Sequence, residues 1–582
     1  MCKSVCATLS FFSAIVLSFY VALSSLLFSP PLRATPLNVP DNTARETLRE
    51  QERQRQLRER LETRPDVQQP SPSMSRLTDE FPEQESPCFK INKINLIGQD
   101  SEQFQFALNV VTKGKAKAIG RCLGVIGINV VITRVQNAVV DKGFVTTRIL
   151  ATPQDLKSGE LDLVVIPGRI RNIIFKSDSP RRILKSAMPV IQGDILNLRD
   201  LEQGLENFKR VPTAEADFQI KPSTDEKAQP GDSDVLIRYK QDFPLRGSIS
   251  IDDGGATSTG RNQVNVTLSY DNLFSLNDLF YVSLNSDIEG GDSSAKGTDG
   301  YTVHYSAPIQ NWLFSATVSE FNFRQTVATA GQTLRYDGES NTSELRLTRR
   351  LHRDARRRTT GYLRAYLRSS RNFINDIEVS LQRRRTAGYE VGVNHREYMG
   401  KNTLDASLAW RRGTGAFNTL AAPEDPFNEG SSRPSLYTAN VSLDVPFNIG
   451  SQSFRYNTRL HAQHNLTPLV PQDRLFIGGR YSVRGFDGEQ GLSADRGWFV
   501  RNDLSVALGG SGQSAYLGVD YGEVDGQASE FLLGKHLAGG VIGLRGRYKK
   551  LNYDVFAGKP ISKPQGFRTA KIVYGFNLTV SF

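Results

Sequence analysis

From Leu245 to Phe582, apolar and polar side chains alternate along the chain with a period of two. In QVNVTLSY (263–270), Val, Val, Leu and Tyr fall on one face and Gln, Asn, Thr and Ser on the other, and KIVYGFNLTVSF (571–582) does the same. About sixteen such segments of roughly 8 to 12 residues follow one another, separated by Gly, Asp, Asn and Pro. Because successive side chains of a strand point to opposite faces, the pattern predicts a mainly β domain over 245–582.

A soluble β-sandwich would also alternate, so the pattern alone leaves two architectures open. The polar faces are unusually polar, since Arg364 and Arg368 share one face of GYLRAYLR (361–368). The apolar faces carry Trp and Tyr near the ends of segments, as the lipid-facing bands of membrane barrels do. The length allows about 21 residues for each strand with its loop, which is typical of these barrels. We therefore expect a sixteen-stranded transmembrane β-barrel.

Before residue 245 the pattern is that of small α+β domains. Residues 88–168 are consistent with the order strand, helix, helix, strand, strand, with FKINKINLIG from Phe89 as the first strand. VVITRVQNAVVDK (130–142) is apolar at helical spacing and stops at a glycine, a common residue after a helix end. Residues 169–240 repeat the same order, so we expect two tandem α+β domains.

The segment 41–64 is charged almost throughout, with Leu48, Leu57 and Leu61 as its only sizeable apolar side chains. A helix this polar lies in solvent or in a water-filled space, so a solvated linker and a helix inside a lumen are both open. Residues 65–87 contain five prolines and are expected to form a flexible linker.

The N-terminal segment resembles a targeting sequence. Residues 7–28 carry no charge, follow Lys3, and are followed by Pro30 and Pro31. This order is typical of a secretory signal peptide, which we place at 1–34, although 22 uncharged residues could also span a membrane as an uncleaved anchor.

Export from the cytoplasm changes the expectation for the cysteines. Only Cys88 and Cys122 remain after the signal peptide, and in an oxidising compartment such a pair most simply forms a disulfide. Two cysteines and six scattered histidines offer too few ligands for a metal site, so no metal is expected.

Composition and motifs exclude several functional classes. Lys and Arg exceed Asp and Glu by 72 to 61, which permits acidic lipid or nucleic acid as a partner but requires neither, and no nucleic acid is expected. At 38% hydrophobic residues, the chain is too polar for a helical membrane protein. No G-x-S-x-G, Walker A or H-E-x-x-H motif is present, so we expect neither an enzyme nor a cofactor.

Three stretches carry a family resemblance. GFVTTRILATPQDLKSGELDLVVIPG (143–168) is similar to a signature G-[YF]-V-T-T-R … P-x-Q-D-L-x-x-G-x-L, with Pro153 and Gln154 adjacent here. NLRDLEQGLENFKRVP (197–212) resembles a helix of a POTRA domain, and RLFIGGRYSVRGFDGE (474–489) resembles an inward loop with the tip V-R-G-[YF]. Together they resemble the outer-membrane transporters of two-partner secretion, the hemolysin-activator or TpsB type, whose superfamily includes the BamA barrel-assembly proteins.

The resemblance implies a Gram-negative outer-membrane transporter that secretes a large partner exoprotein, of hemolysin, adhesin or contact-inhibition type, without nucleotide. The domains 88–168 and 169–240 would be periplasmic POTRA domains that recognise the partner, and the helix in 41–64 would plug the barrel. Outer-membrane lipid and lipopolysaccharide would surround a monomer. A BamA-like insertase and a passive porin are the alternatives.

The resemblance also points to a site inside the barrel. Residues 474–496 would be the inward loop, with Val483, Arg484, Gly485 and Phe486 at its tip. In AYLGVDYGEV (515–524), alternation turns Gly518 and Asp520 inward, and glycine would leave room for the loop tip.

We therefore expect Arg484 and Asp520 to form an ion pair that pins the loop, a pairing inferred partly by analogy with the family; a rim loop with a solvated arginine is the alternative. For recognition of the partner, Arg148, Gln154 and Asp155 are weak candidates. Two arginine-dense stretches, 349–358 and 382–385, are interpreted as lumenal charge or lipopolysaccharide contacts.

Overall fold

The computed structural model of the chain describes residues 42–62, 65, 67, 80–114, 117–288, 295–328 and 333–582. The predicted signal peptide, 1–34, and most of the predicted linker lie outside the described residues. Within those described ranges, no helix combines the length and the apolar character needed to cross a membrane.

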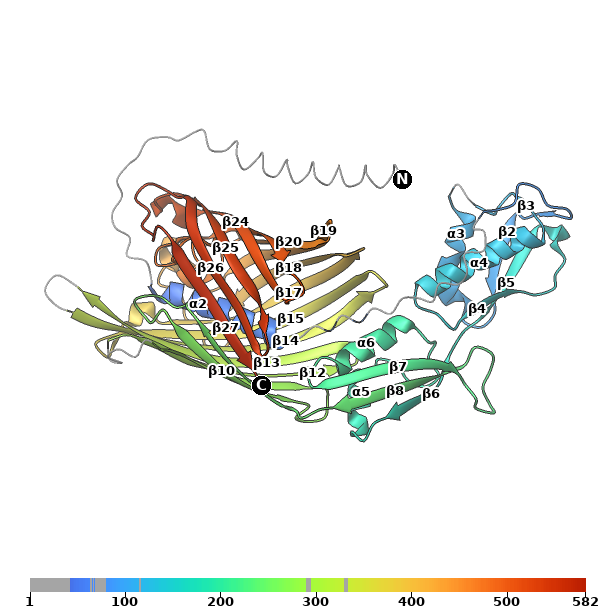
Figure 1. Ribbon diagram of the computed structural model, residues 1–582, viewed down its shortest axis with the longest axis horizontal. Coiled ribbons are helices and arrows are strands. Elements are labelled where there is room, and N and C mark those ends of the chain that lie inside the picture. The colour runs from blue at the N-terminus through green and yellow to red at the C-terminus, as the bar shows by residue number, and fades with distance from the viewer. Residues whose placement is uncertain are drawn as a thin grey trace. The chain divides into compact units, whose positions relative to one another are not determined.

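The C-terminal part of the chain is a closed antiparallel barrel of sixteen strands (Figure 1), which confirms the predicted architecture. It begins with β9 (Leu245–Asp252) and closes where β27 (Val573–Ser581) pairs with β9 from Ser581↔Ser248 to Asn577↔Asp252. The two-residue β16 (Ile377–Glu378) is an additional strand on β15. The other strands are β10 (Gln263–Asp271), β11 (Leu279–Asp287), β12 (Gly297–Ile309), β13 (Trp312–Ala328), β14 (Thr333–Arg353), β15 (Arg357–Ile374), β17 (Arg384–Met399), β18 (Asn402–Thr414), β19 (Ser435–Ile449), β20 (Gln452–Asn465), β23 (Arg496–Ala507), β24 (Gln513–Asp525), β25 (His536–Tyr548) and β26 (Leu551–Ser562).

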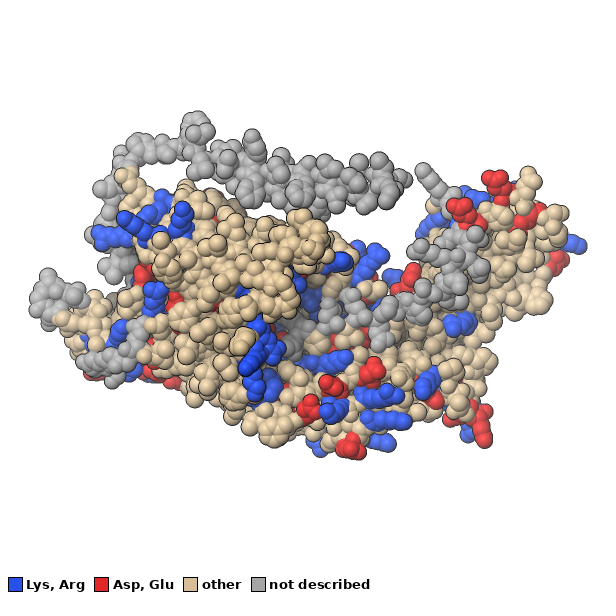
Figure 2. All heavy atoms as spheres, viewed as in Figure 1, with Lys and Arg blue, Asp and Glu red and all other residues tan. Residues whose placement is uncertain are grey.

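The strands turn their polar faces inward and their apolar faces outward. On β10, Gln263 and Thr267 are buried, whereas Val266 and Leu268 are exposed on the outside. Figure 2 shows the middle of the wall over β24 to β27 almost free of charged side chains, which gather toward the ends of the strands. This is the reverse of a soluble sandwich, whose apolar faces meet in a core, and it matches a wall that faces lipid.

Hairpins place short turns at one end of the barrel and long loops at the other. We call the end at which β9 begins the near rim and the opposite end the far rim. Near-rim turns such as 354–356 between β14 and β15 are short, whereas far-rim connections such as 415–434 and 466–495 are long. Short turns on one side and long loops on the other are characteristic of outer-membrane barrels.

The first α+β domain precedes the barrel and contains a three-stranded sheet in the order β2-β5-β4. The predicted strand from Phe89 is divided in two, because β1 pairs with β3 whereas β2 pairs with β5. The domain's elements are β1 (Phe89–Lys90), β2 (Lys93–Ile97), η2 (Ser101–Leu108), α3 (Asn109–Thr112), β3 (Cys122–Leu123), α4 (Val125–Asp141), β4 (Arg148–Ala151), η3 (Leu156–Ser158) and β5 (Glu160–Ile166).

Helix α4 begins earlier than the sequence pattern predicted, at Val125 rather than at residue 130. The reason is a cap from a distant residue: the Glu85 carboxylate accepts hydrogen bonds from the backbone N–H groups of Gly124, Ile126 and Gly127 at 2.7 to 3.2 Å. A carboxylate at a helix N-terminus satisfies otherwise unpaired N–H groups and complements the helix dipole.

The second α+β domain repeats the plan with a sheet in the order β6-β8-β7, covered by two helices (Figure 1). Leu201, Leu205 and Phe208 of α6 pack in its core with Ile237 of β8. Its elements are β6 (Ile170–Lys176), α5 (Arg181–Ala187), α6 (Leu198–Phe208), β7 (Ala214–Pro222) and β8 (Ser233–Gln241). Two tandem α+β domains are therefore present, as predicted.

Candidate functional site in the barrel lumen

The connection between β20 and β23 enters the barrel. It spans 466–495, so it leaves the wall earlier than the predicted start at 474. Inside it, β21 (Leu475–Ile477) and β22 (Leu492–Ala494) form a short hairpin. Val483 and Phe486 at its tip are fully buried in an apolar cluster with side chains from the barrel wall. A loop at the rim with a solvated tip is therefore excluded.

Arg484 is fixed by the Asp520 carboxylate on β24. Its Nε donates to Oδ2 at 2.7 Å and its Nη2 to Oδ1 at 2.8 Å, while its backbone N–H donates to Oδ2 at 3.0 Å. The arginine side chain is 4% exposed and the aspartate side chain 1%. Such a two-point contact fixes orientation as well as distance, because the planar guanidinium matches the carboxylate.

A second carboxylate, that of Asp503 on β23, also binds this arginine. Arg484 Nη2 donates to Asp503 Oδ1 at 2.6 Å. Burial alone would lower the pKa of the Arg484 guanidinium, but its hydrogen bonds and charge interactions with Asp520 and Asp503 raise it. Arg501 and Arg545 approach the two carboxylates at 3.8 and 3.3 Å, so the buried charges compensate one another.

Glycines of the wall make room for the loop tip. A Cβ at Gly539 on β25 would lie 1.7 Å from the Arg484 carbonyl oxygen, and one at Gly518 would lie 2.7 Å from Arg484 Nη2. A Cβ at Gly558 on β26 would lie 3.1 Å from the Cα of Gly485. Gly485 itself has φ of +95° and its added Cβ would meet the Lys559 carbonyl at 2.5 Å. The tip thus contacts bare backbone on three neighbouring strands.

The charged N-terminal segment forms helix α2 (Asn42–Leu61), which lies in the lumen (Figure 1). Its contacts with the inward loop and the wall are polar. The hydrogen bonds run from Arg45 to the Glu489 carbonyl, from Arg49 to the Gly488 carbonyl at 2.6 Å, from Gln54 to Thr302, from Arg58 to Glu344 at 3.1 Å and from Arg60 to Thr579 at 3.2 Å. From residue 45 to the end of the helix, the buried apolar side chains are Leu57 and Leu61.

A line of alternating charges connects the helix to the inward loop across the wall. Arg58 of α2 pairs with Glu344, and Asp473 belongs to the loop. The intervening ion pairs are Glu344–Arg364 at 3.1 Å, Arg364–Glu390 at 2.8 Å, Glu390–Arg411 at 3.3 Å and Arg411–Asp473 at 3.4 Å. A cavity of about 220 Å³ separates α2 from the loop on this side, lined by His461, Arg411 and Asp473 among others. The lumenal wall along this line of ion pairs is therefore charged.

The arginines of 382–385 lie at the far rim rather than in the lumen. Arg383 binds Glu378 at 2.5 and 2.6 Å, Arg384 binds Glu424 at 2.5 Å, and Arg385 donates to the Phe417 carbonyl at 2.8 Å. The last two contacts join neighbouring far-rim loops.

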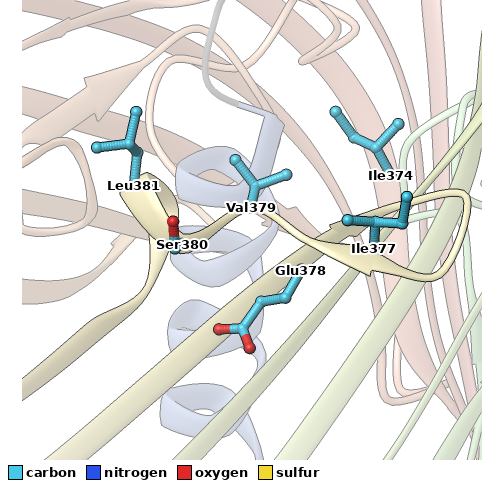
Figure 3. A pocket seen from close by; sticks show the side chains of 6 residues that line it. All are labelled: Ile374, Ile377, Glu378, Val379, Ser380 and Leu381. Carbon is cyan, nitrogen blue, oxygen red and sulfur yellow. The ribbon is translucent and has the colours of Figure 1, made fainter.

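An open apolar depression adjoins these loop contacts. Figure 3 shows Ile374, Val379 and Leu381 pointing to one side of the ribbon and Glu378 to the other. The charge of Glu378 thus faces away from the apolar side chains.

In the first α+β domain, the predicted disulfide cysteines and the residues predicted to recognise the partner all form contacts within the domain. Cys88 and Cys122 form a disulfide with a Cα–Cα distance of 5.3 Å. Arg148 donates to the Val145 and Thr147 carbonyls, and the Asp155 carboxylate caps the turn of η3. Gln154 uses both amide atoms on the backbone of Asp162, at 2.7 and 2.8 Å. These contacts describe structural roles for Gln154 and Asp155, and both Arg148 and Asp155 are exposed.

Sequence reasoning missed Asp503 and two of the wall glycines. The alternation that turned Asp520 inward also applies to RND (501–503), where Arg501 and Asp503 share the inner face, so that signal was present. Nothing in the pattern distinguishes Gly539 and Gly558 from other strand glycines, because their role depends on which strand the loop tip approaches.

Comparison with known proteins covers most of the chain. Residues 231–546 match the family model of the haemolysin secretion/activation protein ShlB/FhaC/HecB, residues 89–168 match the ShlB-type POTRA domain, and residues 169–222 match a POTRA domain. The chain is 36% identical over 517 residues to the outer membrane transporter CdiB-2 of Burkholderia pseudomallei strain 1026b, covering 86% of this chain and 87% of that protein.

Other relatives are similar over comparable lengths. The outer membrane transporter CdiB of Dickeya dadantii strain 3937 is 27% identical, with 86% of this chain and 87% of that protein covered. Among solved structures, CdiB from Acinetobacter baumannii is 29% identical and superimposes with a TM-score of 0.82, covering 94% of this chain and 100% of that one.

Proposed function

This chain belongs to the haemolysin secretion/activation family ShlB/FhaC/HecB, and from that premise we propose how it secretes a partner protein. It is an outer-membrane transporter of two-partner secretion, and its two POTRA domains lie in the periplasm. The near rim therefore faces the periplasm and the far rim the outside. We propose that the partner is a large exoprotein of hemolysin, adhesin or contact-inhibition type, and that it crosses through the barrel lumen.

A charged line of lumenal wall beside helix α2, which fills the lumen, is the observation that carries this route. Helix α2 is held to the wall and to the inward loop mainly by hydrogen bonds and ion pairs, which water can replace when the helix leaves. An unfolded chain needs a wet, polar path, because its backbone N–H and C=O groups must stay hydrogen-bonded. We propose that α2 closes this path at rest and leaves it during transport, and that folding of the partner outside drives export without nucleotide.

The ion pair of Arg484 with Asp520 and Asp503 holds the inward loop in this scheme, so that the loop shapes the path beside α2. Arg148 stays a weak candidate for partner contact, since its guanidinium bonds only backbone carbonyls of its own segment. Gln154 is less suited to that role because both its amide atoms bind the Asp162 backbone, and one carboxylate oxygen of Asp155 is used in its own turn.

The surroundings of the barrel follow from its outer surface. The band exposed on β10 and its neighbours would be covered by lipid. Above it, outward-facing pairs such as Arg371–Glu339 at 2.7 Å lie near the far rim and would contact lipopolysaccharide headgroups. We propose a monomeric transporter in this environment, since the barrel is closed by its own strands.

The test is an export assay with a candidate partner in an outer-membrane host. Arg484→Ala leaves two buried carboxylates without their central cation, a loss typically worth about 3–5 kcal/mol, so we expect the partner in the medium to fall by about tenfold or more. Arg496→Ala is the matched control, because Arg496 on β23 pairs with Asp525 at the exposed far rim. Heat-modifiable gel mobility reports whether each barrel has folded.

Equal secretion by Arg484→Ala and Arg496→Ala from equally folded barrels would contradict the role given to the loop. If removing the whole transporter instead depleted other barrels from the outer membrane, a BamA-like insertase would replace the present proposal. A passive porin would leave the partner's secretion unchanged when the transporter is removed.

A further inference from the structure

The arginine-dense stretch 349–358 surrounds the near-rim turn between β14 and β15, and its side chains reach the second POTRA domain. Arg350 forms an ion pair with Asp200 of α6 and donates to the Arg199 carbonyl at 3.2 Å. Arg353 approaches Glu202 at 3.2 Å and Glu206 at 2.9 Å, and Arg358 approaches Glu206 at 2.8 Å. We call this set, Arg350, Arg353 and Arg358 with Asp200, Glu202 and Glu206, the rim latch.

Burial distinguishes the rim latch from ordinary surface ion pairs. The side chains of Arg353, Glu202 and Glu206 are 5%, 1% and 7% exposed. Charges this deeply buried are costly unless they are paired, so the acidic face of α6 and the arginines of the turn strongly favour one relative position. Figure 2 shows acidic and basic side chains intermixed over the POTRA region beside the barrel, in contrast to the middle of the wall.

The same residues hold the chain that leaves the plug. Arg353 Nη2 donates to the Val67 carbonyl at 2.6 Å, and the Val67 N–H donates to Glu206 at 3.4 Å. Leu57 and Leu61 at the end of α2 pack in the same apolar cluster as the core of the second POTRA domain. Val67, six residues after the end of α2, is thus held between α6 and the rim.

Three further contacts of the domain with the near rim are hydrogen bonds to backbone carbonyls. Asn207 donates to the Gln310 carbonyl at 2.8 Å, Arg210 donates to the Ser306 carbonyl at 3.2 Å, and Asn277 donates to the Ile183 carbonyl at 2.8 Å. These contacts lie close to the covalent connection from β8 to β9.

We propose that the rim latch is an autoinhibitory contact that couples the second POTRA domain to the plug. While it is closed, α6 and the rim arginines clamp the segment at Val67, so α2 stays in the lumen. When it opens, α6 moves off the near rim and α2 follows into the periplasm. This inference builds on the proposed role of α2 as a plug, and its test separates the two.

The test records single channels of the full-length transporter in planar lipid bilayers without partner. In the double variant Arg353→Gln, Arg358→Gln, neutral amides replace the two cations that pair with Glu202 and Glu206, so we expect the fraction of time in the open state to rise at least tenfold. Arg357→Gln is the matched control, because Arg357 lies in the same turn but pairs with Glu397 of the barrel. A variant lacking 42–61 measures the fully unplugged current.

If the deletion conducts while the double variant stays as closed as Arg357→Gln, the rim latch is refuted and the plug role stands. If the deletion conducts no more than wild type, the plug role fails and the latch fails with it. A second variant guards against poor folding of the first. Asp200→Cys with Arg350→Cys, joined by a photocleavable thiol cross-linker, should lower secretion at least tenfold until light restores it, and unchanged secretion would also refute the latch.

Discussion

At the residue scale, glycine in the barrel wall is as important for holding the inward loop as charge is, because it leaves room for the loop backbone. Arg484 supplies the specific contact, but its carbonyl oxygen reaches the wall only because position 539 has no side chain. Packed interiors do not absorb even one extra methyl group without displacement. Glycine on this strand therefore serves close approach of two backbones, which is one of the established uses of glycine in sheets.

Gly539→Ala tests this close approach. The new Cβ would lie 1.7 Å from the Arg484 carbonyl oxygen, so the loop tip must move away from the wall and its contact with Asp520 must weaken. We expect secretion to fall by about tenfold or more, since misplacement by about 1 Å can cost such factors at constrained sites.

Gly540→Ala is the control for that variant, because the neighbouring Cβ would meet only the flexible end of Ile561 at 3.2 Å. Both barrels should fold, as judged by heat-modifiable mobility. Equal secretion from the two alanine variants would show that the tip tolerates displacement.

Alternation turned Asp520 inward, because the inner face of β24 follows from its period of two, and the family resemblance helped to pair it with Arg484. The same rule would have found Asp503. It could not identify Gly539 or Gly558, because their role is to contact the loop tip and the sequence does not show which strands the tip approaches. At this scale the sequence predicts which face a residue occupies but not which distant backbone it will meet.

Helix α2 shows at the element scale how a polar helix can be both held and released. Most of its contacts are ion pairs and hydrogen bonds, which contribute little net free energy where water can compete. The apolar anchors Leu57 and Leu61 lie at its C-terminal end, against the POTRA core. The composition of 41–64 predicted a helix in solvent or in a water-filled space and did not decide between them. The anchoring role of its two last leucines depends on the surface that they meet.

Leu57→Ala with Leu61→Ala should loosen the plug without changing its charge. Each buried leucine shortened to alanine typically costs about 2–5 kcal/mol, and each 1.4 kcal/mol is a factor of ten, so we expect the open fraction in bilayers to rise by about tenfold or more. Arg55→Ala is the control, because Arg55 is half exposed and pairs only within the helix, with Glu52 and Glu59. An open fraction equal to that of Arg55→Ala would mean that the polar contacts alone retain the helix.

The parts of the whole molecule are predictable from the sequence, whereas the contacts that join them are not. Period-two alternation predicted the sixteen-stranded barrel, and the repeated strand and helix order predicted two tandem α+β domains. The rim latch joins Glu206 to Arg358, which are 152 residues apart. Its arginines are conspicuous in the sequence, but no local rule assigns them to an acidic helix rather than to lumen or lipopolysaccharide.

The central claim is that the partner crosses through the lumen of this barrel. Neighbouring residues of β17 allow a direct test, because Asn394 lies on the inner face and Val393 is exposed on the outer face. A photo-activated cross-linking residue is placed at one position or the other, and cells are illuminated during secretion. We predict that the partner becomes linked to position 394 and not to position 393. Active secretion with links from position 393 alone would contradict transport through the lumen.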